Sequence, residues 1–120
     1  MPNKVIAIVD DLFFASKIRG TAEALKVSVS FPRTLDSLIE SVGSEPPRLI
    51  ICDLNATRID PIRLSKRLKA DETLRSIPLL GFFSHVDTEL QRHATEAGFD
   101  HVLPRSAFTS KLPQIIQGEL

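Results

Sequence analysis

Short apolar runs alternate with amphipathic helical patterns along the whole chain, and this alternation limits the folds that the sequence can adopt. Residues 5–9 (VIAIV), 49–52 (LIIC) and 78–83 (PLLGFF) are apolar runs typical of strands buried on both faces of a parallel sheet. Residues 27–31 (VSVSF) predict a half-exposed strand, and residues 100–103 (DHVL) predict a short fifth strand.

Helical spacing of apolar residues follows each of these runs. Helices are expected at residues 14–25, 35–42, 62–74 and 87–97 and after residue 106. Thr34 and Ser106 are expected to cap their helices at the amino end. Gly43 and Gly98 are expected to end helices, and Pro113 to bend or delay the last one.

Strict alternation of strands and helices predicts a doubly wound α/β fold. Five parallel strands would be joined by right-handed crossovers, with helices on both faces and the strand order 2-1-3-4-5. The length of 120 residues corresponds to one domain, spanning residues 1–120. In such sheets a ligand site lies beyond the carboxyl ends of the strands, where the strand order reverses.

Composition excludes several classes of partner. The chain has 15 basic and 15 acidic residues, so no overall charge draws it to nucleic acid or to an anionic membrane. The basic run at residues 63–75 includes Asp71 and Glu72 and no aromatic residue, which indicates a solvated amphipathic face. No apolar run approaches the roughly 18 residues of a membrane span. The lone Cys52 is expected in the core, and a cytoplasmic protein is expected.

Acidic residues follow two strands that should be neighbours in the sheet. Asp10 and Asp11 come after the first strand, and Asp53 comes after the third. Three carboxylates at one edge would raise one another's pKa values, and a hard divalent cation such as Mg²⁺ would resolve the conflict. The alternative is that Asp10 or Asp11 simply caps the following helix.

With these acids in place, the sequence resembles the response-regulator receiver domain over essentially all 120 residues. The resemblance is carried by VDD at residues 9–11, CDLN at residues 52–55, Ser84, Gly98 and Arg105. It implies a flavodoxin-like fold and a phosphoacceptor in two-component or phosphorelay signalling. It implies no enzyme activity beyond the chain's own phosphorylation and dephosphorylation.

The resemblance also implies a role for each site residue. Asp53 would be the phosphoacceptor, attacking a phosphohistidine as a nucleophile. Asp11 and Asp53, with the backbone carbonyl of Asn55, would hold Mg²⁺, and Asp10 would act partly through water. The hydroxyl of Ser84 would hydrogen-bond a phosphoryl oxygen and pull its loop inward. Arg105 would pair with the phosphoryl group or with Asp53, and its larger guanidinium needs more room than a lysine.

The implied partners are other proteins. A histidine kinase or a phosphotransfer protein would supply the phosphoryl group, and a downstream partner would bind the face of the fourth helix, fifth strand and fifth helix. A homodimer is a further option. Since the sequence ends at Leu120 with no further domain, output is expected through protein contacts, unless the chain is a fragment.

Three departures from the family lie near the fifth strand. Arg105 replaces the usual lysine, Ser106 replaces a proline that follows a cis peptide bond, and Val102 replaces an aromatic switch residue. A cis bond without proline costs about 3 kcal/mol, so a trans bond is expected. A valine cannot swing a ring between two positions. The alternative function is therefore a pseudo-receiver scaffold that keeps the fold without phosphotransfer.

Residues beside Ser84 raise two further hypotheses. Val86 stands where polar side chains of family members help to place the hydrolytic water, so a slowly decaying phosphoaspartate is predicted. His85 could make the site sensitive to pH. A Mg²⁺-dependent phosphatase fits less well, because that class spaces its acids as D-x-D. A nucleotide or flavin carrier lacks its Gly-rich loop here.

Overall fold

Five parallel strands form a single sheet in the computed structural model, which describes residues 4–84 and 86–119. The order is β2-β1-β3-β4-β5, as predicted. The strands are β1 (Lys4–Ile8), β2 (Ser28–Ser30), β3 (Leu49–Asp53), β4 (Leu79–Phe83) and β5 (His101–Pro104). All four strand pairings are parallel, so every strand brings its carboxyl end to the same edge.

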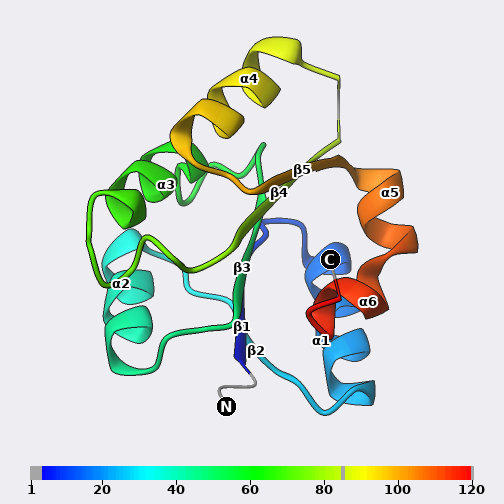
Figure 1. Ribbon diagram of the computed structural model, residues 1–120. Coiled ribbons are helices and arrows are strands. Elements are labelled where there is room, and N and C mark those ends of the chain that lie inside the picture. The colour runs from blue at the N-terminus through cyan, green and yellow to red at the C-terminus, as the bar shows by residue number, and fades with distance from the viewer. Residues whose placement is uncertain (1–3, 85, 120) are drawn as a thin grey trace.

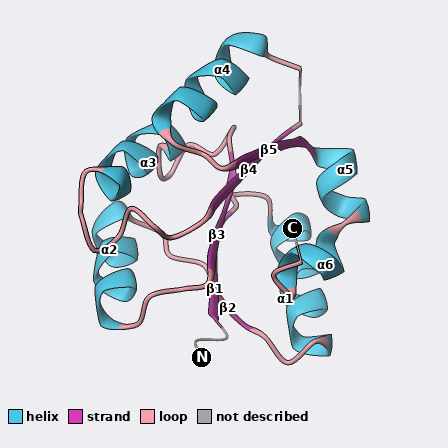
Figure 2. Cartoon of the chain, viewed as in Figure 1, coloured by secondary structure: helices cyan, strands magenta, loops and turns pink. Residues whose placement is uncertain are grey.

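Helices cover both faces of this sheet. They are α1 (Leu12–Ala24), α2 (Leu35–Ser44), α3 (Pro61–Lys69), α4 (Thr88–Ala97), α5 (Arg105–Ser110) and α6 (Leu112–Ile116). The sheet is seen edge-on in Figure 1, with α2, α3 and α4 on one side and α1, α5 and α6 on the other. The loops that follow β1, β2 and β3 leave the sheet at its carboxyl edge (Figure 2), where a ligand site is expected.

The central strands are buried on both faces, which explains their continuous apolar sequences. Val5 and Ala7 of β1 belong to the core beneath α1, α5 and α6. Ile6 and Ile8 alternate with them and belong to the core beneath α2, α3 and α4. Each buried valine or isoleucine side chain contributes roughly 1.5–3 kcal/mol. Cys52 lies in the second core, as expected, and burial raises the pKa of its thiol.

Three phenylalanines connect α1, β4 and α5 on one side of the sheet. The ring centroids of Phe14 and Phe82 are 5.0 Å apart, and those of Phe82 and Phe108 are 4.5 Å apart and stacked. Phe14 also lies 5.7 Å from Phe108. We call these residues the phenylalanine cluster. Phe14 lies in the first turn of α1 and Phe82 pairs in register with Asp53, so the cluster packs near the carboxyl edge of the sheet.

Two predicted helix ends are wrong, each for a local reason. Helix α2 continues through Gly43 to Ser44. Helix α3 ends at Lys69 instead of reaching residue 74. There the side chain of Asp71 accepts hydrogen bonds from the backbone N–H and the hydroxyl of Thr73, at 2.8 and 2.7 Å. These bonds stabilise a turn in place of another helical turn.

The last helical segment also differs from the prediction. Helix α5 begins at Arg105, directly after β5, and no side chain caps it, so the predicted cap at Ser106 is wrong. Pro113 has no backbone N–H to donate to the preceding turn. The segment accordingly divides into α5 and α6, with Pro113 in the first turn of α6. Across residues 4–84 and 86–119, no helix is long and apolar enough to cross a membrane.

Candidate functional site

Asp53 ends β3 at the carboxyl edge of the sheet, where its side chain is half-buried. One of its oxygens, Oδ1, accepts a hydrogen bond from the backbone N–H of Asn55 at 2.9 Å. Burial raises the pKa of Asp53, the Asn55 N–H lowers it, and the charges of Asp10 and Asp11 raise it further. Asp10 and Asp11 are therefore close enough to Asp53 to raise its pKa, although they follow a different strand.

Asp10 connects the end of β1 to the loop between β3 and α3. Its Oδ2 accepts hydrogen bonds from the backbone N–H of Thr57 at 2.8 Å and from the Thr57 hydroxyl at 3.1 Å. Thr57 is absent from the predicted site, because a hydroxyl in a loop after a strand has no distinctive spacing. The contact holds the loop that carries Asn55 against the end of β1.

Asp11 caps α1, which is the alternative that the sequence left open. Its Oδ1 accepts hydrogen bonds from the backbone N–H groups of Phe13 and Phe14 at 2.9 and 3.2 Å. Its Oδ2 lies 3.4 Å from Nη2 of Arg105. The hydrogen bond from Phe14, with help from Arg105, lowers the pKa of Asp11. Asp11 thus stays ionised as a cap while one oxygen faces the site.

Arg105 reaches the site from the first turn of α5. Its guanidinium lies over the Phe14 ring, with the central carbon 4.2 Å from the ring centroid, and pairs with Asp11. Its charge also lowers the pKa of Asp53. Among the described residues no peptide bond is cis, as expected for the bond before Ser106. An arginine at this position therefore still brings a cation beside the carboxylates.

Asn55 and Ser84 join the loops that follow β3 and β4. The backbone N–H of Ser84 donates to Oδ1 of Asn55 at 3.3 Å, and the Ser84 side chain is exposed. His85 lies outside the described residues. Val86 is 84% exposed. Val102, at the predicted position of the aromatic switch, is half-buried and packs against the core beneath α4.

The donor chemistry of the site suits Mg²⁺, because the predicted ligands are all oxygen atoms. The carboxylates of Asp10 and Asp11 have other partners, however. Asp10 accepts a hydrogen bond from Thr57, and Asp11 accepts one from the start of α1 and pairs with Arg105. In the part of the chain that the structure describes, no group of three acidic, histidine or cysteine side chains is arranged to hold a metal ion. The Arg105 cation beside Asp11 therefore competes with a metal ion for the Oδ2 oxygen.

No known protein-family model matches the sequence, and no curated protein matches it. Solved structures do match. The phosphorylated cyanobacterial phytochrome response regulator RcpA has a TM-score of 0.76 at 22% identity, with 96% of this chain and 89% of that chain covered. The chemotaxis response regulator CheY4 of Vibrio cholerae has a TM-score of 0.80 at 16% identity, with 98% of each chain covered.

A third match is the signal receiver domain of a response regulator from Bermanella marisrubri, with a TM-score of 0.82 at 16% identity and 98% of each chain covered. In each of these comparisons the alignment covers at least 89% of both chains. The chain has the fold of a response-regulator receiver domain.

Proposed function

We propose that the chain is a phosphoacceptor receiver domain in which Asp53 takes a phosphoryl group from a histidine kinase or a phosphotransfer protein. One observation carries the proposal: Asp53 is a half-buried carboxylate at the end of a central strand, and its pKa responds to Asp10, Asp11 and Arg105 together. Such a concentration of interacting charges at a strand end is typical of a reactive site. A cytoplasmic location is part of this proposal.

The proposed reaction transfers a phosphoryl group from a histidine of the donor protein to Asp53. An Oδ atom of Asp53 would attack phosphorus, the N–P bond of the phosphohistidine would break, and the released imidazole would take up a proton. Mg²⁺ held by Asp11, Asp53 and the carbonyl of Asn55, with Asp10 acting partly through water, would neutralise charge on the phosphoryl group.

Arg105 and Ser84 would act on the phosphoryl oxygens. Arg105 already places a cation near Asp53, and its guanidinium can bind two oxygens at once. The hydroxyl of Ser84 would donate a hydrogen bond, which would move the loop after β4. That loop leads into α4, so the motion would bias the face of α4, β5 and α5, where a downstream partner or a second copy would bind.

A pseudo-receiver scaffold is the second candidate, and the Asp11–Arg105 pair favours it. Oδ2 of Asp11 faces the guanidinium while Oδ1 caps α1, so both oxygens of a proposed Mg²⁺ ligand are engaged. While this pair persists, the guanidinium charge beside Oδ2 of Asp11 opposes metal binding there, which would weaken phosphotransfer. Half-buried Val102 also offers no ring to rotate, so the scaffold would act through a fixed surface.

The test is incubation with acetyl phosphate and Mg²⁺, followed by intact-mass measurement. The expected result is the addition of one phosphoryl group to the wild type and none to Asp53→Asn. Asp36→Asn is the matched control, since Asp36 is an exposed acid on α2, away from the site. Wild type that stays unlabelled while folded supports the scaffold. Equal labelling of Asp53→Asn would show that another residue is the acceptor.

A further inference from the structure

A pocket of about 360 Å³ opens beside the acidic site, near the ends of β1 and β2. It lies between the start of α1 and the loop after β2, and the loop after β3 completes it. Its lining mixes polar and charged groups with apolar side chains, which include Ile8, Leu12, Phe31, Pro32 and Ile59. Its size falls within the range for small-molecule sites, and it lies outside the carboxyl ends of β1, β2 and β3, where such folds bind ligands.

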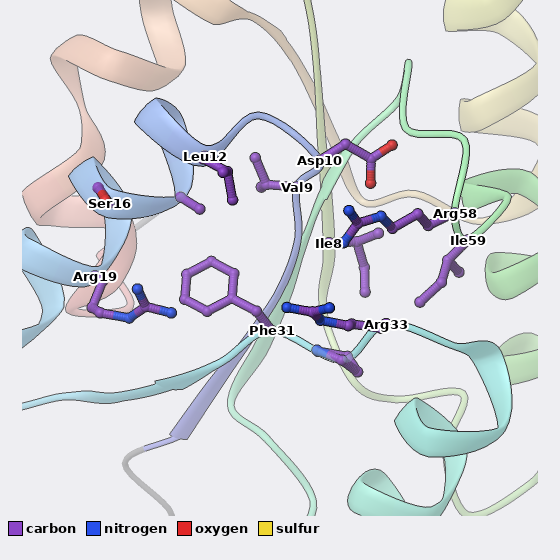
Figure 3. Close-up of a pocket in the computed structure, with 12 residues that line it drawn as sticks. Ile8, Val9, Asp10, Leu12, Ser16, Arg19, Phe31, Arg33, Arg58 and Ile59 are labelled. Atoms are coloured by element: carbon purple, nitrogen blue, oxygen red, sulfur yellow. The ribbon is translucent and has the colours of Figure 1, made fainter.

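Three arginines from different elements line this pocket. Arg19 comes from α1, Arg33 from the loop after β2 and Arg58 from the loop after β3. Figure 3 shows all three guanidinium groups directed toward the interior of the pocket, with Phe31 between Arg19 and Arg33. The central carbon of Arg19 lies 4.7 Å from the centroid of the Phe31 ring. We call this site the arginine pocket.

The positive charge of the arginine pocket is not balanced by the chain itself. Within residues 4–84 and 86–119, Arg33 and Arg58 form no ion pair or hydrogen bond. Asp10 is the only acidic side chain in the lining, and its Oδ2 is bonded to Thr57. Because acidic and basic residues are equal in number over the whole chain, this local excess does not follow from composition. Like charges gathered in a concave site repel unless an anion binds.

We infer that the arginine pocket binds an organic phosphomonoester with a flat apolar body. Three guanidinium groups and one carboxylate leave an excess of two positive charges, which matches a phosphate dianion. Guanidinium groups bind phosphate oxygens in pairs. Leu12, Phe31 and Pro32 provide the apolar surface for the body of the ligand, and Phe31 can stack on a ring. Asp53 does not line the pocket, although Asp10 lines it and also belongs to the acidic site.

Calorimetric titration with phenyl phosphate, in buffer with a chelator and no divalent cation, tests the inference. Without a divalent cation the carboxylates of the acidic site disfavour phosphate, so competing binding there is reduced. We expect a dissociation constant of roughly 0.1–1 mM, since the arginines are exposed, and weaker binding at high salt. Inorganic phosphate should bind more weakly than phenyl phosphate, and phenol should not bind.

Variants locate the site. Arg33→Gln and Arg58→Gln should each weaken phenyl phosphate binding roughly fivefold to tenfold, because each removes a charged hydrogen-bond donor. Arg63→Gln is the control, since Arg63 is an exposed arginine on α3 outside the pocket. Asp53→Asn should bind as the wild type does, which separates this site from the proposed phosphoacceptor. No saturable binding, or equal loss of affinity in Arg63→Gln, overturns the inference.

Discussion

The guanidinium of Arg105 lies over the ring of Phe14, with its central carbon 4.2 Å from the ring centroid. The same guanidinium pairs with Asp11. Phe14 belongs to the phenylalanine cluster, in which its ring packs against Phe82 and Phe108. A lysine would present a compact charge at this position, whereas the planar guanidinium can stack and pair at the same time. Arg105 is therefore held at the site by the core below it as well as by the acid beside it.

A double-mutant cycle of Arg105→Gln and Phe14→Leu measures this contact. We expect a coupling free energy of about 0.5–1 kcal/mol, because the Arg105 side chain is 40% exposed. Urea unfolding of the wild type, both single variants and the double variant gives the value. Additive losses, with no coupling, would show that Arg105 does not stack on Phe14 in solution.

Removing the positive charge of Arg105 should change the affinity of the site for Mg²⁺. In Arg105→Gln, Oδ2 of Asp11 loses its charged partner and becomes available to a metal, so we expect binding to tighten by roughly threefold to tenfold. Asp11→Asn should weaken binding, and Arg63→Gln should leave it unchanged. Calorimetric titration with MgCl₂ gives all three affinities. Weaker Mg²⁺ binding in Arg105→Gln would mean that Arg105 does not compete with the metal.

Asp53 should make the fold less stable as pH rises. Burial and the neighbouring acids raise its pKa in the folded state, so the folded protein keeps this proton to higher pH than the unfolded chain does. Stability is then lost as pH rises from the unfolded pKa, about 4, through the folded pKa.

Asp53→Asn removes this titration. It should be more stable than the wild type at neutral pH, by about 1 kcal/mol or less, because the carboxylate is only half-buried. The difference should vanish below about pH 4, where both side chains are neutral. Thermal unfolding across this range in a metal-free buffer checks it. A difference that does not change with pH would contradict the assignment.

The order of the sheet could be predicted because β1, β3 and β4 each need apolar residues toward both faces. In a chain that alternates strands with helices, a short unbroken apolar run such as residues 49–52 predicts a central strand that is buried on both faces. The position of Asp53 follows from the same logic, since parallel strands present their carboxyl ends at one edge. The arrangement of Asp11 does not follow, because an acid after a strand can cap a helix or bind a metal with the same spacing.

The helix ends and the arginine pocket needed the structure. Asp71 ends α3 through bonds to Thr73, and this outcome depends on a local competition with the helical hydrogen bonds. Arg19, Arg33 and Arg58 are far apart in the sequence and belong to three different elements. Only the packing of two loops against α1 brings them together.

Gly81 in β4 marks a close approach between strand and loop. A Cβ atom placed there would lie 2.7 Å from Cδ2 of Leu54, a buried residue just after β3. Gly81→Ala should therefore lower the free energy of unfolding by about 1–3 kcal/mol. Gly20→Ala is the contrast, because a Cβ at this position in α1 has nothing within 4 Å. It should stabilise the protein by roughly 0.5–1 kcal/mol. Urea unfolding gives the free energy of unfolding of both variants. Equal changes in the two variants would contradict the close contact between Gly81 and Leu54.

Val86 should set the lifetime of a phosphoryl group on Asp53, if the proposed function holds. Its side chain is exposed and cannot hydrogen-bond an attacking water, so the phosphoaspartate should decay slowly. Val86→Gln adds a group that can orient water, and we expect decay to accelerate by roughly threefold to tenfold. Val86→Ala shortens the side chain without adding a hydrogen-bonding group and should leave the rate close to that of the wild type. Intact mass after removal of acetyl phosphate gives the three rates, and equal acceleration in both variants would indicate that valine acts by shielding the site from water.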